Sequence, residues 1–160
     1  VAGKQALPDL FIDIVRRLPS ELDIVVAGAP EDPARNPDFA PLFALPRVSF
    51  DASDFERLAP KLRAARLVIA VDTAAMHLAV AVGAPTLCLA SAAYVNEIVP
   101  YAREITPPNV RFLWTPIECA GCLGHCILPP EENRFPCVAR LSSEQVLGTV
   151  DYMVAVSAVQ

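Results

Sequence analysis

Residues 67–83 have the sequence LVIAVDTAAMHLAVAVG, which is the clearest signal of fold class in the chain. Its first five residues are apolar and rich in β-branched side chains, which indicates a strand buried on both faces. A helix that is apolar nearly all round follows from Ala74 to Val82 with almost no loop, and Gly83 suits the position just after its end. A strand that leads directly into a helix is the repeating unit of open parallel α/β sheets.

The same alternation of strands and helices continues on both sides of this stretch. Strands are expected over residues 24–27, 48–50, 85–89 and 110–113, and helices over residues 8–18, 53–65 and 142–156. Ser53 with Glu56 forms a capping box that opens the second of these helices. Residues 29–46 hold five prolines, which indicates a loop with at most one short helix. The pattern predicts an α/β fold, a Rossmann-like parallel sheet with helices on both faces.

Composition limits the class of protein. The chain has 160 residues, which is the length of one domain, and 54% of them are hydrophobic, which excludes a disordered chain. The net charge of −5 argues against a nucleic-acid partner, because such a partner needs a basic face. The longest apolar stretch, residues 76–89, is too short for the roughly 20 residues of a membrane-spanning helix. The chain begins at Val1 rather than Met, and we expect it to be a fragment of a longer protein.

The end of the strand at residues 67–71 is the candidate binding site, because ligands of parallel sheets bind beyond the carboxyl ends of the strands. Asp72 or Thr73 can cap the following helix, whose first N–H groups then face outward and attract phosphate. Ala74 is small enough to let an anion approach, and His77 lies one turn further on the same side. These features favour a pyrophosphate site. The alternative is that Asp72 and Thr73 only cap the helix and that His77 is a core histidine.

Four of the five cysteines crowd into a proline-rich segment near the carboxyl end. The first pair has the CxxC spacing of structural zinc sites, and a zinc ion would hold together a loop that has little core of its own. Reduced thiols, two disulfides and an iron–sulfur cluster are the alternatives, and His125 could replace one thiol. The candidate ligands are Cys119, Cys122, Cys126 and Cys137. The fifth cysteine, Cys88, lies in an apolar run and is expected to be buried.

Residues 71–86, VDTAAMHLAVAVGAPT, resemble the signature of the heptosyltransferase family, glycosyltransferase family nine, which has the pattern Asp-Thr/Ser-Gly-x-x-His-Leu-x-x-Ala-x-Gly-x-Pro. Residues 28–32, GAPED, resemble that family's Gly-x-x-x-Glu loop, and the cysteine segment up to Leu141 resembles its C-terminal cysteine cluster. The chain departs from the pattern at Ala74 and Ala75, where the family has Gly and a frequent Pro. It also departs at residues 91–94, SAAY, which replace a Gly-x-Thr-like segment.

The resemblance implies a fold and a set of roles. Heptosyltransferases have two Rossmann-like domains that face each other across a cleft, the GT-B fold, and residues 1–160 would be the C-terminal, donor-binding domain with a cysteine-rich loop at 115–140. Backbone amides of Thr73 and Ala74 and the Thr73 hydroxyl would bind the diphosphate, with His77 beside it. Asp72 would contact the sugar or order the turn. Glu31 or Asp32 would bind the ribose hydroxyls, and Lys4 would bind a phosphate.

The resemblance also implies partners. The donor would be a nucleotide-diphosphate sugar similar to ADP-heptose, and a glycan or lipid-linked acceptor such as lipopolysaccharide core would bind through a separate N-terminal domain. No catalytic residue is expected in this fragment, and the family's transfer step needs no cofactor, so a zinc ion at the cysteines would be structural. The implied location is the cytoplasm, at the inner face of the membrane. A non-catalytic α/β binding module with a metal-stabilised cysteine loop is the alternative function.

Overall fold

The computed structural model describes residues 2–157 of the chain, and its elements alternate as the sequence predicts. The strands are β1 (Ile24–Ala27), β2 (Val48–Asp51), β3 (Val68–Val71), β4 (Thr86–Leu89) and β5 (Val110–Leu113). The α-helices are α1 (Pro8–Arg17), α2 (Asp32–Arg35), α3 (Ala40–Phe43), α4 (Phe55–Ala64), α5 (Ala74–Ala81), α6 (Pro136–Ala139) and α7 (Ser143–Ser157). Three short 3₁₀-helices complete the described chain, η1 (Ala2–Lys4), η2 (Pro37–Phe39) and η3 (Ala92–Tyr94).

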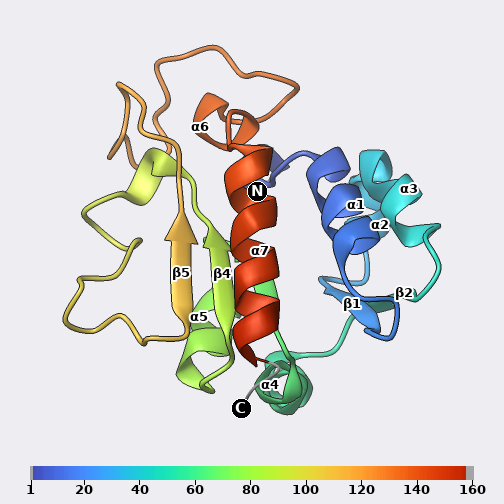
Figure 1. Ribbon diagram of the computed structural model, residues 1–160. Helices are drawn as coiled ribbons and strands as arrows, with labels where there is room; N and C mark the ends of the chain where they lie inside the picture. Colours follow the sequence, from blue (N-terminus) through green and yellow to red (C-terminus); the bar gives the residue numbers. More distant parts are fainter. Residues whose placement is uncertain (1, 158–160) are drawn as a thin grey trace.

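The strands are parallel, which confirms the predicted α/β class, but they form two sheets. β1 pairs with β2, and β3, β4 and β5 form a second sheet with β4 in the centre. In Figure 1 the β1–β2 pair and helices α1–α3 lie on one side of α7, and β4, β5 and α5 lie on the other. Every residue of β4 is buried, as expected of a central strand covered on both faces.

Helix α1 connects the two sheets, because two of its faces are buried in two different cores. One face packs against β4 and α7, and the other packs against α3, β1 and β2. The first core includes Leu10, Ile14, Leu87, Leu89, Val146 and Val150, and the second includes Ile12, Val15 and Leu42. The helix thereby joins both sheets into one packed unit.

The opposite face of the three-stranded sheet is covered by α5. Met76 of α5 packs with Cys88 of β4 and with Val99, all of them fully buried. Ala79 of the same helix packs against Leu58 and Leu62 of α4. Helices therefore cover both faces of this sheet, as predicted, and the expected burial of Cys88 is confirmed.

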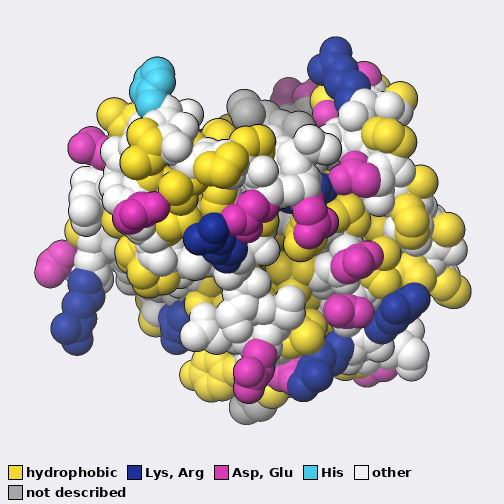
Figure 2. Space-filling view, turned by 90° about the horizontal axis from the view of Figure 1, so that it is seen from above, with side chains coloured by type: hydrophobic (Ala, Val, Ile, Leu, Met, Phe, Trp, Pro, Cys, Tyr) yellow, Lys and Arg dark blue, Asp and Glu magenta, His cyan; other side chains and the backbone are white. Residues whose placement is uncertain are grey.

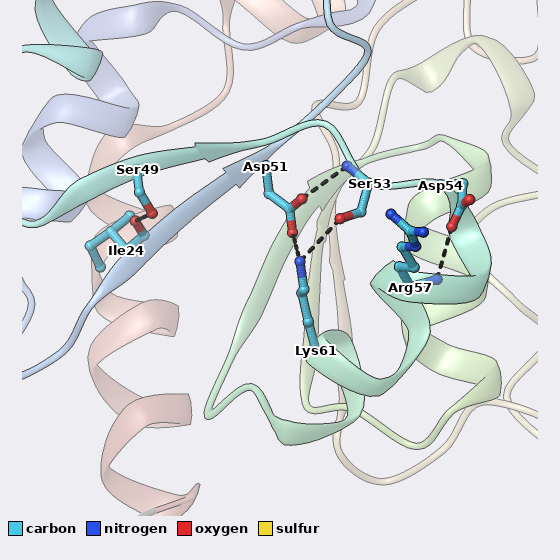
Figure 3. Close-up of polar contacts among 7 residues, drawn as sticks. All are labelled: Ile24, Ser49, Asp51, Ser53, Asp54, Arg57 and Lys61. Carbon is cyan, nitrogen blue, oxygen red and sulfur yellow. Dashed lines mark hydrogen bonds and ion pairs between the residues drawn. The ribbon is translucent and has the colours of Figure 1, made fainter.

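Two local predictions are wrong. Residues 29–46 form α2, η2 and α3 rather than a loop with at most one short helix, because each of these helices has a proline in its first turn, where no N–H donor is needed. Helix α4 is capped by Asp54, whose carboxylate accepts a hydrogen bond from the N–H of Arg57 at 3.0 Å, and not by Ser53 (Figure 3).

Ser53 belongs instead to a polar cluster at the end of β2. The Lys61 ammonium lies 2.6 Å from the Asp51 carboxylate and donates to the Ser53 hydroxyl at 3.0 Å (Figure 3). Hydrogen bonds to Asp51 from Lys61, and from the hydroxyl and the N–H of Ser53, lower the pKa of Asp51 from 3.8 to about 2. The cluster holds the start of α4 against the end of β2.

The carboxyl ends of β4 and β5 point toward η3, α6 and the cysteine loop, by which we mean residues 115–140 (Figure 1). Figure 2 views the molecule from this side, where acidic and basic side chains are interspersed with hydrophobic ones. No helix within residues 2–157 has the length and apolar character needed to cross a membrane.

Candidate anion-binding site

The carboxylate of Asp72, directly after β3, is the centre of the candidate site. Its side chain is only 3% exposed. It accepts hydrogen bonds from the Ser91 hydroxyl at 2.8 Å and from the Ser91 N–H at 3.3 Å, and the Lys4 ammonium lies 3.3 Å from it. Asp72 thus joins the ends of β3 and β4. The roles that the resemblance implies for it, a sugar contact or an ordered turn, stay predictions.

Lys4 reaches this carboxylate from a position 68 residues earlier in the chain. Its ammonium also lies 4.0 Å from the centroid of the Tyr94 ring, within the range of a cation–π contact. The Lys4 side chain keeps 17% of its surface exposed. A partly exposed cation is therefore held beside the strand end at which an anion was expected to bind.

The first turn of α5 is open to solvent next to this pair. Thr73 and Ala74 are exposed. Thr73 is the N-cap residue, but its hydroxyl donates to the carbonyl of Val71 at 3.3 Å and makes no side-chain cap. The N–H of Met76 donates to the carbonyl of Thr73 at 3.1 Å, whereas no hydrogen bond is described for the N–H groups of Ala74 and Ala75, which are available to a ligand.

His77 lies one turn into α5, and its imidazole contacts a residue that lies outside this helix. Its backbone N–H donates to the carbonyl of Thr73 at 3.3 Å. Its Nδ1 lies 2.5 Å from the hydroxyl oxygen of Tyr101, and the two rings stack with centroids 5.7 Å apart. The imidazole is half-buried, so it is neither a solvent-exposed surface group nor a fully enclosed core residue.

The loop after β1 places Asp32 and Glu31 differently. The Asp32 carboxylate accepts a hydrogen bond from the N–H of Ala29 at 2.8 Å, so it folds back over the end of β1. A Cβ at Gly28 would lie 2.7 Å from that carboxylate, which explains the glycine at this position. Glu31 pairs instead with Arg35 at 3.4 Å on an exposed face.

The structure brings Lys4 and Asp72 into contact, with Thr73, Ala74 and His77 on the adjoining turns of α5. The described contacts of Glu31 and Asp32 stay within their own loop. Ser91 and Tyr101 were not predicted as members of the site. Ser91 lies two residues after the end of β4. This position at the carboxyl end of a strand is the signal from which its place in the site could have been predicted.

The cysteine loop brings two of its thiols together. The Sγ atoms of Cys119 and Cys126 are 3.8 Å apart, far beyond the roughly 2.05 Å of a disulfide, and all five cysteines are free. Burial, a hydrogen bond to Cys126 and the neighbouring thiols raise the pKa of Cys119 to about 11. Burial also raises the pKa of Cys137.

Only part of this cluster suits a zinc ion. Two thiolates on one tetrahedral zinc, with bonds of about 2.3 Å, lie about 3.8 Å apart, which is the spacing of Cys119 and Cys126. Across residues 2–157, however, no group of three or more His, Cys, Asp or Glu side chains is arranged to hold a metal ion. The four-thiol zinc site of Cys119, Cys122, Cys126 and Cys137 therefore stays a prediction.

The cysteine loop rests on the element that borders the candidate site. The N–H of Gly121 donates to the carbonyl of Ala92 at 2.8 Å, and the N–H of Leu123 donates to that of Ala93 at 2.8 Å. Both acceptors belong to η3, between Ser91 and Tyr94. The loop thus supports the backbone from which these two residues contact Asp72 and Lys4.

A comparison with family models gives a match to part of the chain. Residues 50–124 match the model of glycosyltransferase family 9 (heptosyltransferase). These residues belong to glycosyltransferase family 9. No curated protein and no solved structure matches the chain.

The family 9 segment includes β3, α5, β4 and β5 and ends within the cysteine loop. It contains Asp72, Thr73, Ala74 and His77, whereas Lys4 and the loop after β1 lie outside it. The expected heptosyltransferase family and the expected enzyme class, glycosyltransferase, are confirmed by this match.

Proposed function

We propose that the chain binds the nucleotide-diphosphate-sugar donor of a heptosyltransferase-like glycosyltransferase, at the carboxyl ends of β1 and β3. The observation that carries this proposal is the contact of Lys4 with Asp72, 3.3 Å long, beside the exposed first turn of α5. A cation and a helix N-terminus that face the same space attract a dianionic group.

The diphosphate of the donor binds at this turn. The N–H groups of Thr73 and Ala74 and the Thr73 hydroxyl donate to its oxygens, and Lys4 balances its charge. Asp72 keeps Lys4 in place, because the buried carboxylate is shared between the ammonium and Ser91. As the sugar leaves, negative charge grows on the diphosphate, and preformed donors of this kind stabilise that charge.

The ribose of the donor nucleotide is assigned to Asp32 rather than Glu31. Asp32 is held over the end of β1 by the Ala29 N–H, and Gly28 leaves room for it there. Glu31 is paired with Arg35 on the surface. A fixed carboxylate at a strand end suits two vicinal hydroxyls better than an exposed one, because less side-chain entropy is lost on binding.

The acceptor side of the reaction lies outside this chain in our proposal. The acceptor is a glycan or a lipid-linked glycan of lipopolysaccharide or of another cell-surface glycan, and a second domain presents it at the inner face of the membrane. Residues 1–160 alone are then expected to bind the donor but not to transfer the sugar, because the acceptor binds to that second domain. Transfer by residues 1–160 alone would contradict this part of the proposal.

Calorimetric titration with ADP and with UDP tests donor binding. The chain has two lysines, and this gives a matched pair of variants, Lys4→Met and Lys61→Met. We expect Lys4→Met to weaken nucleotide binding about 10- to 100-fold, as for the loss of a charge-assisted hydrogen bond. Lys61 pairs with Asp51, so Lys61→Met is expected to leave the affinity within about twofold.

A third variant, His77→Ala, extends the test to α5 and is expected to weaken binding as well. Circular dichroism of each variant shows that the fold is retained. If neither nucleotide binds, or if both lysine variants bind equally well, donor binding is wrong. The non-catalytic binding module with a metal-stabilised cysteine loop is then the better description.

A further inference from the structure

Tyr101 touches His77 in two ways. Its hydroxyl oxygen lies 2.5 Å from Nδ1 of the imidazole, and the two rings stack with an angle of 25° between their planes. The hydrogen bond restricts rotation of the imidazole about the bond that joins it to its Cβ, and the two rings lie nearly parallel on either side of this hydrogen bond. Neither constraint comes from α5, the helix that carries His77.

Tyr101 is itself held in place by its surroundings. Phe112 of β5 meets its ring edge-on at 5.0 Å between centroids, and the Thr106 hydroxyl donates to its carbonyl at 3.2 Å. Burial, with a smaller effect of the nearby Cys88 thiol, raises the pKa of Tyr101 above its ordinary value of 10. The phenol therefore keeps its proton near neutral pH and is available as a hydrogen-bond donor.

We propose that Tyr101 is a positioning residue, which donates its phenolic hydrogen bond to Nδ1 of His77 and so holds the neutral imidazole in the Nε2–H tautomer. A neutral imidazole has one N–H, and the partner of one ring nitrogen decides the state of the other. With Nδ1 as acceptor, Nε2 is a donor.

The consequence for the ligand rests on the proposed function. A donor at Nε2, one turn from the exposed start of α5, suits an anionic oxygen such as that of the donor's diphosphate. The opposite tautomer would present a lone pair to that oxygen and repel it. Tyr101 thus selects an anionic ligand by setting the tautomer of its neighbour.

The tautomer can be measured directly by nitrogen NMR. The chain has two histidines, and the second, His125, is exposed, so His125→Gln leaves a single imidazole to observe. The measurement is made at about pH 8.5, about two units above the ordinary imidazole pKa. We expect the Nε2–H form to dominate in this parent protein and a mixture of tautomers to appear on Tyr101→Phe.

Tyr152→Phe is the matched control, because Tyr152 is 57% exposed on α7. It is expected to leave the imidazole signals unchanged. An Nδ1–H form in the parent protein overturns the proposal, and so does a Tyr101→Phe spectrum identical to the parent's. The parent measurement needs no variant of Tyr101, so it decides the matter even if Tyr101→Phe fails to fold.

Titration with ADP separates this inference from the proposed function. Tyr101→Phe is expected to weaken ADP binding about fivefold, as for one neutral hydrogen bond, and to have no further effect in a His77→Ala background. An equal loss in both backgrounds would mean that Tyr101 acts independently of His77, which overturns the positioning role. If ADP does not bind at all, the proposed function fails, and the tautomer measurement still decides the role of Tyr101.

Discussion

At the scale of single residues, Ser91 supplies two hydrogen bonds to the buried carboxylate at the end of β3. An unpaired buried carboxylate is costly, and Asp72 offsets this cost through Lys4 and two hydrogen bonds from Ser91. Ser91 is itself fully buried. The sequence places a serine where the family pattern has a different segment, and the serine supplies a donor that this site requires.

Ser91→Ala is therefore expected to destabilise the protein. It removes a hydroxyl donor from a buried carboxylate, and we expect the free energy of unfolding to fall by about 1.5–3 kcal/mol, as measured by denaturant titration. Ser49→Ala is the control, because the Ser49 hydroxyl makes an exposed hydrogen bond to the Ile24 carbonyl at 3.3 Å (Figure 3). The control is expected to change stability by no more than about 0.5 kcal/mol. Equal losses in both variants would show that Ser91 has no special role.

At the scale of elements, the end of α1 depends on one side chain from a distant loop. The Arg47 guanidinium donates to four carbonyls at distances of 2.6–2.9 Å, those of Val15, Leu18, Pro19 and Leu22. Arg47 adopts a positive φ of 64°, which is uncommon for a residue other than glycine. The guanidinium compensates for this strain through its hydrogen bonds to the Val15 and Leu18 carbonyls at the end of α1 and to the Pro19 and Leu22 carbonyls just beyond it.

Arg47→Ala is expected to lower the free energy of unfolding by about 2–3 kcal/mol, because charged hydrogen bonds to the end of α1 are lost. Arg47→Lys should recover only part of this loss, since an ammonium cannot reproduce the planar fork of the guanidinium. The control is Arg35→Ala, where a 71% exposed side chain is removed from a surface pair. Thermal unfolding of the three variants checks this, and a loss for Arg35 as large as that for Arg47 would contradict it.

The predicted zinc site of the cysteine loop can be tested directly by measuring the metal content of the protein. We expect about one zinc per chain in protein purified without chelators, and a lower melting temperature after the metal is removed, because thiolate ligands stabilise a loop with little regular structure. Cys122 and Cys137 would have to close on the Cys119–Cys126 pair. Cys88→Ser is the control, since Cys88 is buried in the sheet and is not expected to affect the metal content. Metal-free protein that is unaffected by chelators would contradict the prediction.

At the scale of the whole molecule, the two sheets are expected to unfold together. Helix α1 buries Ile14 in the core of the three-stranded sheet and Ile12 in the core of the β1–β2 pair. Arg134 adds a second connection, because its guanidinium bonds to the Gln5 carbonyl and to the Asp38 carboxylate. Neither sheet can lose its core without exposing a face of α1.

Ile12→Ala and Ile14→Ala test this coupling. Each is expected to cost about 2–5 kcal/mol and to lower the midpoint of one common unfolding transition. Trp114 packs against the core of the three-stranded sheet. Within each variant, circular dichroism and Trp114 fluorescence should give the same unfolding midpoint. If Ile12→Ala produced a separate early transition without a change in Trp114, the two sheets would be independent units.

Much of the fold could be predicted from the sequence, because the signals of strands and long helices are local. The strand at residues 67–71 and the helix after it are decided by side chains within one or two turns of each other. The short helices after β1 were missed because a proline signals a break and a first turn equally well. The predicted cap at Ser53 was wrong because the neighbouring Asp54 caps α4 instead. The Ser53 hydroxyl accepts a hydrogen bond from Lys61, which lies further along α4.

The candidate site divides in the same way. Local sequence is enough to predict the exposed start of α5, the glycine that makes room for Asp32 and the carboxylate at the end of β3, since each depends on neighbours along the chain. The contacts of Lys4 and Ser91 with Asp72, and of Tyr101 with His77, depend instead on the tertiary structure. These contacts span 19 to 68 positions. They form because the packing of α1, α5 and β4 brings distant segments to one edge of the sheet, and no local pattern encodes that packing.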